Sequence, residues 1–416
     1  MQALLPVNLC SQAVTIALPI HRNTVEMPPQ IIKSVVPLHV GQFMFVRIET
    51  DQGIVGYGEA GIWGHITAAG TAIERFAEYL VGKDAFPIEH HWNTMHRFSY
   101  FQGLAINAAI SAIDIALWDI KARALGVPIY ELLGGACRTK ARVYCHIYEK
   151  SIEKVLEECK KKKEAGFTAF GHINPFLDEG NDQVYFKPHA RKMNEAIANV
   201  EKMRAVVGDD VDLLVELHRR LTPAEAITFS NAIEHLRPLF VEDPIRPENP
   251  DAMARVADRI SVPIATGERF GTIYEFQALL ARNAVEYVRV DLALCGGITG
   301  AKKVAAIAEA HQAQVVPHNP LSPIGLAACL QLVASIPNFT VQEYATGFES
   351  GVFHSTNKHL GHDIVDHVPE VHEGFVDIPS GPGLGIKLLD NAAEVRPALV
   401  QPIAMRLHKD GFVVDQ

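Results

Sequence analysis

The chain has 416 residues, of which 48% are hydrophobic and 21% are charged, and its formal net charge is -10 at pH 7. This composition is typical of a globular protein with a sizeable core and room for two domains. The acidic balance argues against nucleic acid as the main partner, and no apolar run approaches the length of a membrane helix. The six cysteines have no Cys-x-x-Cys spacing, which favours a reducing compartment, so we expect a cytoplasmic protein.

The first part of the chain predicts an α+β domain. Residues 1–20 are apolar but broken by polar residues, and they lack a basic n-region, so we interpret them as an opening strand and not as a signal peptide. Residues 43–60 predict a β-hairpin, because apolar and polar side chains alternate on both sides of a turn. Apolar residues at helical spacing predict helices over about 67–82 and 104–125, and a Gly-Val-Pro sequence stops the second one.

The pattern of predicted strands and helices changes at about residue 140. Short apolar strands then alternate with longer amphipathic helices, which indicates parallel βαβ units. Eight such strands predict a (β/α)₈-type barrel with an imperfect last unit. A Gly/Pro-rich stretch at 374–389 is expected to return to the N-terminal domain. The predicted divisions are an N-terminal domain, a barrel and a C-terminal segment, over residues 1–135, 136–345 and 346–416.

An ionisable residue stands near the end of each of six successive barrel strands, about one βα unit after the previous one. The ends of barrel strands converge on one mouth, where barrel enzymes carry their active sites. A single buried acid at such a place is more often structural, but six in phase favour an active site. The six residues are Glu216, Glu242, Glu268, Asp291, His318 and Glu343.

Three of these residues, Glu216, Glu242 and Glu268, predict a metal site. Three carboxylates cannot all be ionised at one mouth without a cation, because like charges raise each other's pKa. A set of oxygen ligands favours Mg²⁺, which completes its octahedron with water and substrate oxygens. The alternative is that Glu216 is structural and forms a salt bridge with a nearby arginine: Arg219, Arg220 or Arg269.

Two histidines complete the predicted chemistry. His318 stands on the strand beside Asp291, and a neighbouring carboxylate fixes the tautomer of an imidazole and raises its basicity, so we predict a general base. His218 follows Glu216 by two residues, and the two-residue period of a strand predicts that both side chains face the mouth. We interpret His218 as an acid on the opposite wall; the alternative is that it only orients Glu216.

Taken together and in order, these motifs resemble the enolase superfamily, and within it the mandelate racemase-like subgroup. The resemblance spans nearly the whole chain and is carried by "GIVGYGEA", "VEDP", "TGER", "RVDLALCGGIT", "VVPHNPLSPIG", "VQEY" and "GPGLGI". It implies a modified (β/α)₇β TIM barrel with an N-terminal capping domain that the C-terminal segment completes. It also implies Mg²⁺, abstraction of a proton α to a carboxylate through an enediolate, and a homo-oligomer. By the same resemblance, Glu343 would donate a hydrogen bond to the enediolate if it were protonated.

One departure from the subgroup bears on the reaction. Members often carry Lys-x-Lys at the end of the second barrel strand, whereas His172 and Asn174 stand there in this chain. Asparagine cannot remove a proton, so a racemase with bases on both faces is in doubt. A single base, His318, and a single acid, His218, favour elimination of a 3-hydroxyl to give a 2-keto-3-deoxy acid.

The pattern is similar to the acid-sugar dehydratases, and we favour an aldonate such as D-galactonate or D-gluconate as the substrate. The alternatives are a mannonate dehydratase, and a cycloisomerase or lactonising enzyme of the same superfamily. Specificity is expected to come from lid segments at 19–30 and 59–70, and the insert at 177–194 could reach the mouth or an oligomer contact. The candidate substrate-binding residues are His172, Asn174, Arg269, Arg22 and Trp63.

Overall fold

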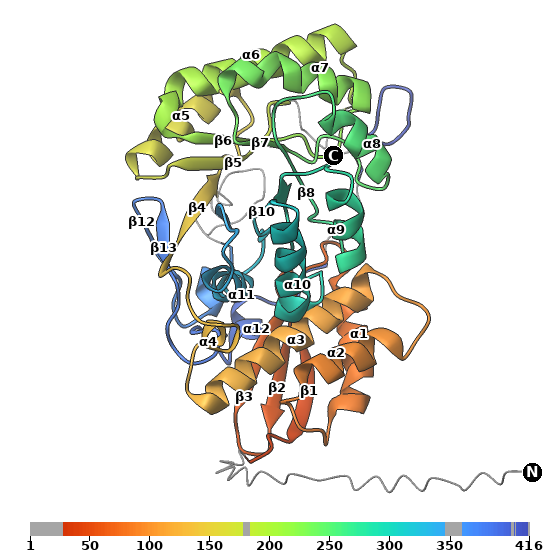
Figure 1. The fold of residues 1–416 in the computed structure, drawn as a ribbon, viewed down its shortest axis with the longest axis vertical. Coiled ribbons are helices and arrows are strands. Elements are labelled where there is room, and N and C mark those ends of the chain that lie inside the picture. The colour runs from red at the N-terminus through yellow and green to blue at the C-terminus, as the bar shows by residue number, and fades with distance from the viewer. Residues whose placement is uncertain (1–27, 178–183, 346–359, 401–402, 404, 415–416) are drawn as a thin grey trace, which may run out of the picture.

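The structure is a computed structural model that describes residues 28–177, 184–345, 360–400, 403 and 405–414. The strand predicted within residues 1–20, and Arg22, therefore lie outside the described residues. Figure 1 shows two lobes, with the N-terminal elements in red and orange below and the strands and helices of the barrel above. None of the described helices is long and apolar enough to cross a membrane.

The lower lobe is built on a three-stranded antiparallel sheet with helices packed against it. Its strands lie in the order β1 (Ile32–Val40), β2 (Phe43–Thr50) and β3 (Val55–Ala60). Its helices are α1 (Ile66–Leu80), α2 (Ile88–Arg97) and α3 (Leu104–Leu125). The predicted hairpin and both predicted helices are confirmed. The prediction missed α2, which has few apolar residues and buries only Ile88, His91 and Met95.

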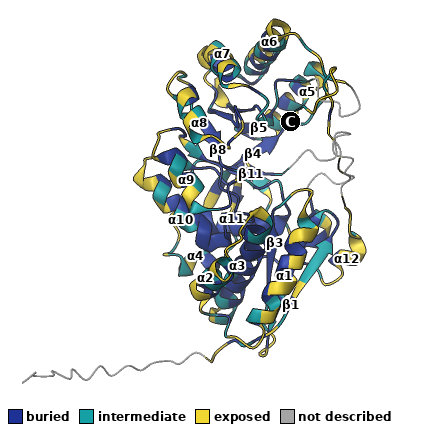
Figure 2. Cartoon of the chain, turned by 90° about the vertical axis from the view of Figure 1, so that its right-hand side faces the viewer, coloured by how far each residue is buried: buried dark blue, intermediate teal, exposed yellow. Residues whose placement is uncertain are grey.

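Helix α3 is buried on most of its surface because it lies between the sheet and the barrel helix α10 (Gly297–Ala310) (Figure 2). Strand β3 approaches α3 closely through glycines. A Cβ atom on Gly58 would lie 2.0 Å from the carbonyl oxygen of Ala112, so no larger residue fits there. The helix ends at Gly126, whose left-handed φ of 70° closes it, as the Gly-Val-Pro sequence predicts.

The barrel consists of eight parallel strands. They are β4 (Lys140–His146), β5 (Ala169–Ile173), β6 (Asp212–Glu216), β7 (Phe240–Glu242), β8 (Ile264–Thr266), β9 (Tyr287–Val288), β10 (Gln314–Val315) and β11 (Gln342–Tyr344). Neighbours in the sequence pair from β4 to β10, and β11 pairs with β4. A parallel bridge between Val315 and Phe339 closes the ring on the other side.

Seven helices connect these strands and cover the barrel. They are α5 (Ile152–Glu164), α6 (His189–Val207), α7 (Pro223–Ile233), α8 (Pro250–Ala257), α9 (Ile273–Leu280), α10 and α11 (Pro323–Ala334). The architecture is therefore the predicted (β/α)₇β barrel with a capping domain. Helix α7 begins with a capping box, in which the side chains of Thr222 and Glu225 each bond the other residue's backbone, so its start was readable from the sequence.

The C-terminal segment contacts both lobes. Strands β12 (Val371–His372) and β13 (Phe375–Asp377) form a hairpin that pairs antiparallel with β4. The chain then reaches the lower lobe, where helix α12 (Ala392–Val395) precedes Arg396, whose carbonyl accepts a hydrogen bond from the Gly41 N–H at 2.8 Å. The domain divisions at residues 135 and 345 stay predictions.

Candidate active site

The three predicted glutamates meet at the carboxyl end of the barrel. Glu216 and Glu242 are the last residues of β6 and β7 and stand in register with one another, while Glu268 lies two residues beyond β8. One oxygen from each carboxylate lies within 4.8 Å of the other two. Glu216 and Glu242 are both buried. The structure thus brings together the three carboxylates that strand spacing predicted.

Glu216 has the properties of a metal ligand. Its Oε1 accepts a hydrogen bond from the His218 N–H at 2.6 Å, but its buried Oε2 has no partner. Burial raises the pKa of Glu216 well above its usual value, and the charges of Glu242 and Glu268 raise it further. A cation would satisfy the orphan oxygen and offset the repulsion.

The alternative role for Glu216, a salt bridge with an arginine, finds no support in the described residues. Arg219 forms ion pairs with Asp243, at 2.9 Å, and with Glu268 instead. Arg269 is paired with Glu248 at 3.7 Å, and the Arg220 guanidinium stacks over an aromatic ring. Among the described residues, no ion pair reaches Glu216, so the three-carboxylate group fits a hard divalent cation by its donor chemistry.

A fully buried arginine supports this site and was missed by the sequence analysis. Arg289 donates hydrogen bonds to Glu242, to Glu343 Oε2 at 2.7 Å and to the Tyr144 hydroxyl at 2.8 Å. It stands two residues before Asp291 in the barrel sequence. A charged residue inside an apolar strand run was the available signal, because such a side chain is tolerated only with partners.

The Glu343 carboxylate forms an ion pair with Arg289. Burial raises the pKa of this carboxyl, but Arg289, His318 and a hydrogen bond from His146 Nε2 at 2.8 Å outweigh burial and hold the pKa well below its usual value. The Asn319 N–H also donates to it at 2.7 Å. These contacts favour the ionised form of Glu343, which accepts hydrogen bonds, whereas the role that the resemblance implies needs the protonated form.

His318 and Asp291 form the predicted pair. Each lies three residues beyond its strand, and a parallel bridge joins their backbones. His318 Nδ1 is 2.8 Å from Asp291 Oδ2, which leaves Nε2 facing Glu268 at 3.5 Å. Burial lowers the pKa of His318, but Glu268, Glu343 and Asp291 outweigh it and raise the pKa to about 9.

His218 lies at the same mouth, but not for the predicted reason. Strand β6 ends at Glu216, and His218 has a left-handed φ of 47°, so strand periodicity does not orient it. The backbone turns there and still keeps the imidazole beside the Glu216 carboxylate. Burial, followed by the charge of Arg219, lowers the pKa of His218 to about 4. The protein by itself thus places a proton on His318 rather than on His218.

His172 lies on the second barrel strand, β5, beside His218. Its ring centroid is 4.4 Å from that of His218 and 5.4 Å from that of His146. Burial lowers the pKa of His172 well below its usual value, and the two neighbouring histidines add to the effect. Asn174 instead turns back on its own chain, and its Oδ1 accepts a hydrogen bond from the Phe176 N–H at 2.8 Å.

Substrate-binding roles stay predictions for the remaining candidates. The Arg269 side chain is half exposed beside Glu248, and Trp63 is 40% exposed. Arg22 lies outside the described residues. His172 is the candidate that the structure brings closest to the acid and the carboxylates.

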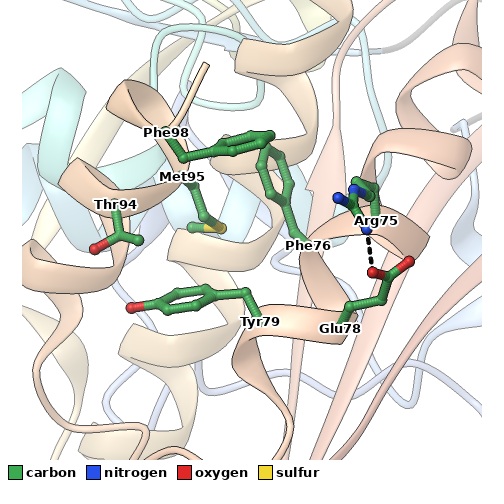
Figure 3. A pocket seen from close by; sticks show the side chains of 7 residues that line it. All are labelled: Arg75, Phe76, Glu78, Tyr79, Thr94, Met95 and Phe98. Carbon is green, nitrogen blue, oxygen red and sulfur yellow. Dashed lines mark hydrogen bonds and ion pairs between the residues drawn. The ribbon is translucent and has the colours of Figure 1, made fainter.

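A separate hollow lies in the capping domain and contains none of these residues. It has a volume of about 280 Å³ and opens between α1 and α2 (Figure 3). Figure 3 shows the rings of Phe76 and Phe98 packed at one side and the Arg75–Glu78 ion pair at the other. Its mostly apolar lining offers no acid–base chemistry, so we assign the chemistry to the barrel mouth.

Comparisons with known proteins agree with this architecture along the chain. The family described as "Mandelate racemase / muconate lactonizing enzyme, N-terminal domain" matches residues 15–134, and the one described as "Enolase C-terminal domain-like" matches residues 155–392. A D-galactonate dehydratase from Verminephrobacter eiseniae is 35% identical over 353 residues, which cover 83% of this chain and 89% of that protein.

Two solved structures extend the likeness to three dimensions. An enolase from Pantoea ananatis, solved with bound D-gluconate and Mg, is 30% identical with a TM-score of 0.83, over 93% of this chain and 100% of that one. An enolase from Agrobacterium radiobacter, solved with bound Na and L-malate, is 26% identical with a TM-score of 0.85, over 93% of this chain and 100% of that one.

Proposed function

The chain belongs to the mandelate racemase/muconate lactonizing enzyme family of the enolase superfamily, and from this premise we propose that it is a Mg²⁺-dependent dehydratase of acid sugars. One observation carries the proposal: the His318–Asp291 pair and His218 lie at the same barrel mouth as the three clustered glutamates. That arrangement supplies a cation site with a titratable imidazole on each of two walls.

Glu216, Glu242 and Glu268 are the residues that would hold Mg²⁺. Their oxygen-only donor set and the unpartnered Oε2 of Glu216 support this assignment. When bound, the ion would supply positive charge that offsets the negative charge developing on the substrate carboxylate as its α-carbon loses a proton. Arg289 donates a hydrogen bond to Glu242 and so holds this carboxylate in place.

His318 and His218 each carry out one of the two proton transfers. Asp291 holds Nδ1–H of His318, so Nε2 is the atom that takes the α-proton of the substrate. His218 gives a proton to the 3-hydroxyl, whose bond to carbon breaks so that it leaves as water. The electron pair of the lost C–H bond forms a double bond between C2 and C3. The resulting enol tautomerises to a 2-keto-3-deoxy acid.

The protonation state of the free protein differs from the one that this reaction needs. The charge of Glu268 keeps a proton on His318, and the charge of Arg219 disfavours one on His218. A cation held by the glutamates would reduce the negative charge around His318 and lower its pKa toward the working range. If His218 were the base instead, replacing His218 and not His318 would abolish exchange of the substrate α-proton with solvent.

We propose an aldonate substrate, with D-galactonate first and D-gluconate second. Relatives about a third identical are D-galactonate dehydratases, and a solved neighbour holds D-gluconate. The test is a screen of aldonic and aldaric acids, including D-mannonate, with Mg²⁺ and semicarbazide detection of 2-keto acid. We expect keto acid from an aldonate. A lactone without keto acid would identify a cycloisomerase, and the absence of turnover with every acid would overturn the proposal.

We also propose that the chain forms a homo-oligomer. Phe98, Tyr100 and Phe101 of the capping domain are 60%, 100% and 85% exposed, and Phe98 also lines the hollow of Figure 3. Such a run of exposed aromatic rings supports an interaction surface. Light scattering should then give a multiple of the 45.7 kDa chain mass, and a monomer across micromolar concentrations would contradict this.

A further inference from the structure

Two histidines at the mouth form, with Glu216, a second group of ligand atoms. One ring nitrogen each of His172 and His218 and one oxygen of Glu216 lie within 4.8 Å of one another. This group shares Glu216 with the three-glutamate cluster but includes neither Glu242 nor Glu268. It lies on the β5–β6 wall, whereas His318 comes from the opposite side of the ring.

Glu216 has a buried atom without a partner, and the two imidazoles beside it are half-buried. Within the described part of the chain, neither imidazole has a hydrogen-bond partner, although the two rings are 4.4 Å apart. Glu216 is 1% exposed, and its Oε2 also has no partner. The buried Oε2 of Glu216 is costly to leave without a partner, and two half-buried imidazoles lie beside it, which indicates that a ligand binds between the three side chains.

The backbone is bent to produce this arrangement. His172 and His218 have φ values of 52° and 47°, in the left-handed region that residues other than glycine rarely adopt. His172 lies within β5 and His218 lies two residues beyond β6, the neighbouring strand, and a ring nitrogen of each lies close to a Glu216 oxygen. Backbone strain of this kind is concentrated at functional sites.

The donor atoms determine which ion the group would take. Two imidazole nitrogens and one carboxylate oxygen are a common set for zinc sites that keep a fourth position open. Mg²⁺ prefers oxygen ligands, whereas imidazole favours Zn²⁺ and other late transition metals. We infer that His172, His218 and Glu216 form a second metal site, which takes Zn²⁺ or a related transition-metal ion in preference to Mg²⁺.

Occupation of this site would inhibit the enzyme. The ion would occupy the lone pair of His218, the residue proposed to protonate the leaving hydroxyl, and would compete for the Glu216 carboxylate. The inhibition rests on the proposed function, whereas the binding of Zn²⁺ does not. The two are therefore measured separately.

The test is a calorimetric titration of the full chain with Zn²⁺ in saturating Mg²⁺. We expect one Zn²⁺ per chain in the wild type. His172→Asn removes a ligand, so its affinity should fall by at least the roughly 10–100-fold that loss of a mere outer-shell partner costs. The matched control is His91→Asn, which alters a buried histidine of helix α2 in the capping domain and should leave Zn²⁺ affinity unchanged.

Equal Zn²⁺ affinity in the wild type and in His172→Asn would overturn the inference. If His172→Asn does not fold, X-ray absorption of the Zn²⁺-loaded wild type decides instead, because two imidazoles are expected around the metal and an oxygen-only shell would overturn the site. Dehydration with Mg²⁺ but no Zn²⁺ binding would contradict this inference alone. Zn²⁺ binding by a chain that dehydrates no acid sugar would contradict the proposed function alone.

Discussion

The Ser322 hydroxyl donates a hydrogen bond to Glu59 Oε2 at 2.5 Å, and this contact joins the capping domain to the loop that carries His318. The same carboxylate accepts the N–H groups of Gly325, at 3.1 Å, and Ser322, at 3.3 Å. Glu59 is fully buried at the end of β3, two residues before Gly61, whose N–H binds the carbonyl oxygen of Ala293 at 2.8 Å. The end of one capping strand thus braces the loops behind both His318 and Asp291.

Glu59→Gln should therefore lower kcat more than it changes KM. The amide replaces one carboxylate oxygen with an N–H₂ group that faces one or two of these three donors, so the loop shifts, and a displacement near 1 Å can cost about 100-fold in rate. The measurement is kcat and KM on the folded variant, with Glu74→Gln, an exposed acid of the same domain, as the control. A lower melting temperature with unchanged kcat would show that Glu59 is only structural.

His318→Asn should abolish turnover and exchange of the substrate α-proton with solvent deuterium. Asparagine can keep the hydrogen bond to Asp291 but cannot accept the proton. Mg²⁺ affinity should survive, because His318 is not one of the three clustered carboxylates. Deuterium exchange followed by NMR checks this, and substantial exchange in the variant would remove His318 from the role of base.

His218→Asn separates the two histidines. If His218 is the acid, the variant should still exchange the α-proton but lose elimination by about 10²–10⁴-fold. Loss of exchange in His218→Asn, with exchange retained in His318→Asn, would reverse the two roles and agree with the proton positions of the free protein. Elimination at full rate would mean that another group is the acid.

Glu216→Gln should weaken Mg²⁺ binding, because it removes the charge of a ligand whose Oε2 has no other partner. We expect a loss of at least 10–100-fold, the cost typical of an outer-shell change. Calorimetry of Mg²⁺ binding measures it, with Glu248→Gln, an acid paired with Arg269 away from the cluster, as the control. Normal affinity in Glu216→Gln would show that the carboxylate does not hold the metal.

Because the Asp114 carboxyl is buried, we expect the stability of the protein to depend on pH. Burial raises the pKa of this carboxyl from 3.8 to about 7, although the Thr299 N–H donates to it at 3.0 Å. Between those pH values the folded chain holds a proton that the unfolded chain has released. The contribution of Asp114 to the free energy of unfolding is therefore fully present below pH 3.8. It falls as the pH rises toward 7, by up to about 1.4 kcal/mol per pH unit.

Asp114→Asn should remove this contribution, so the free energy of unfolding should decline less between pH 5 and 7 than in the wild type. Urea denaturation at several pH values measures it. The exposed Asp258→Asn should keep the wild-type slope. An unchanged slope in Asp114→Asn would show that this carboxyl is not the group that titrates.

The sequence pattern by itself determined a barrel of alternating strands and helices, the residues of its mouth and the pairing of His318 with Asp291, while the (β/α)₇β form was implied by the resemblance to the enolase superfamily. These features depend on order along the chain, because each βα unit repeats the same local pattern and ends at the same face. Only the tertiary structure decided the rest. The Glu59–Ser322 bond joins positions far apart in the sequence, and the state of Glu343 depends on the charge of Arg289. The proximity of His172, His218 and Glu216 depends on the left-handed φ values of the two histidines, which the apolar periodicity of the sequence does not record.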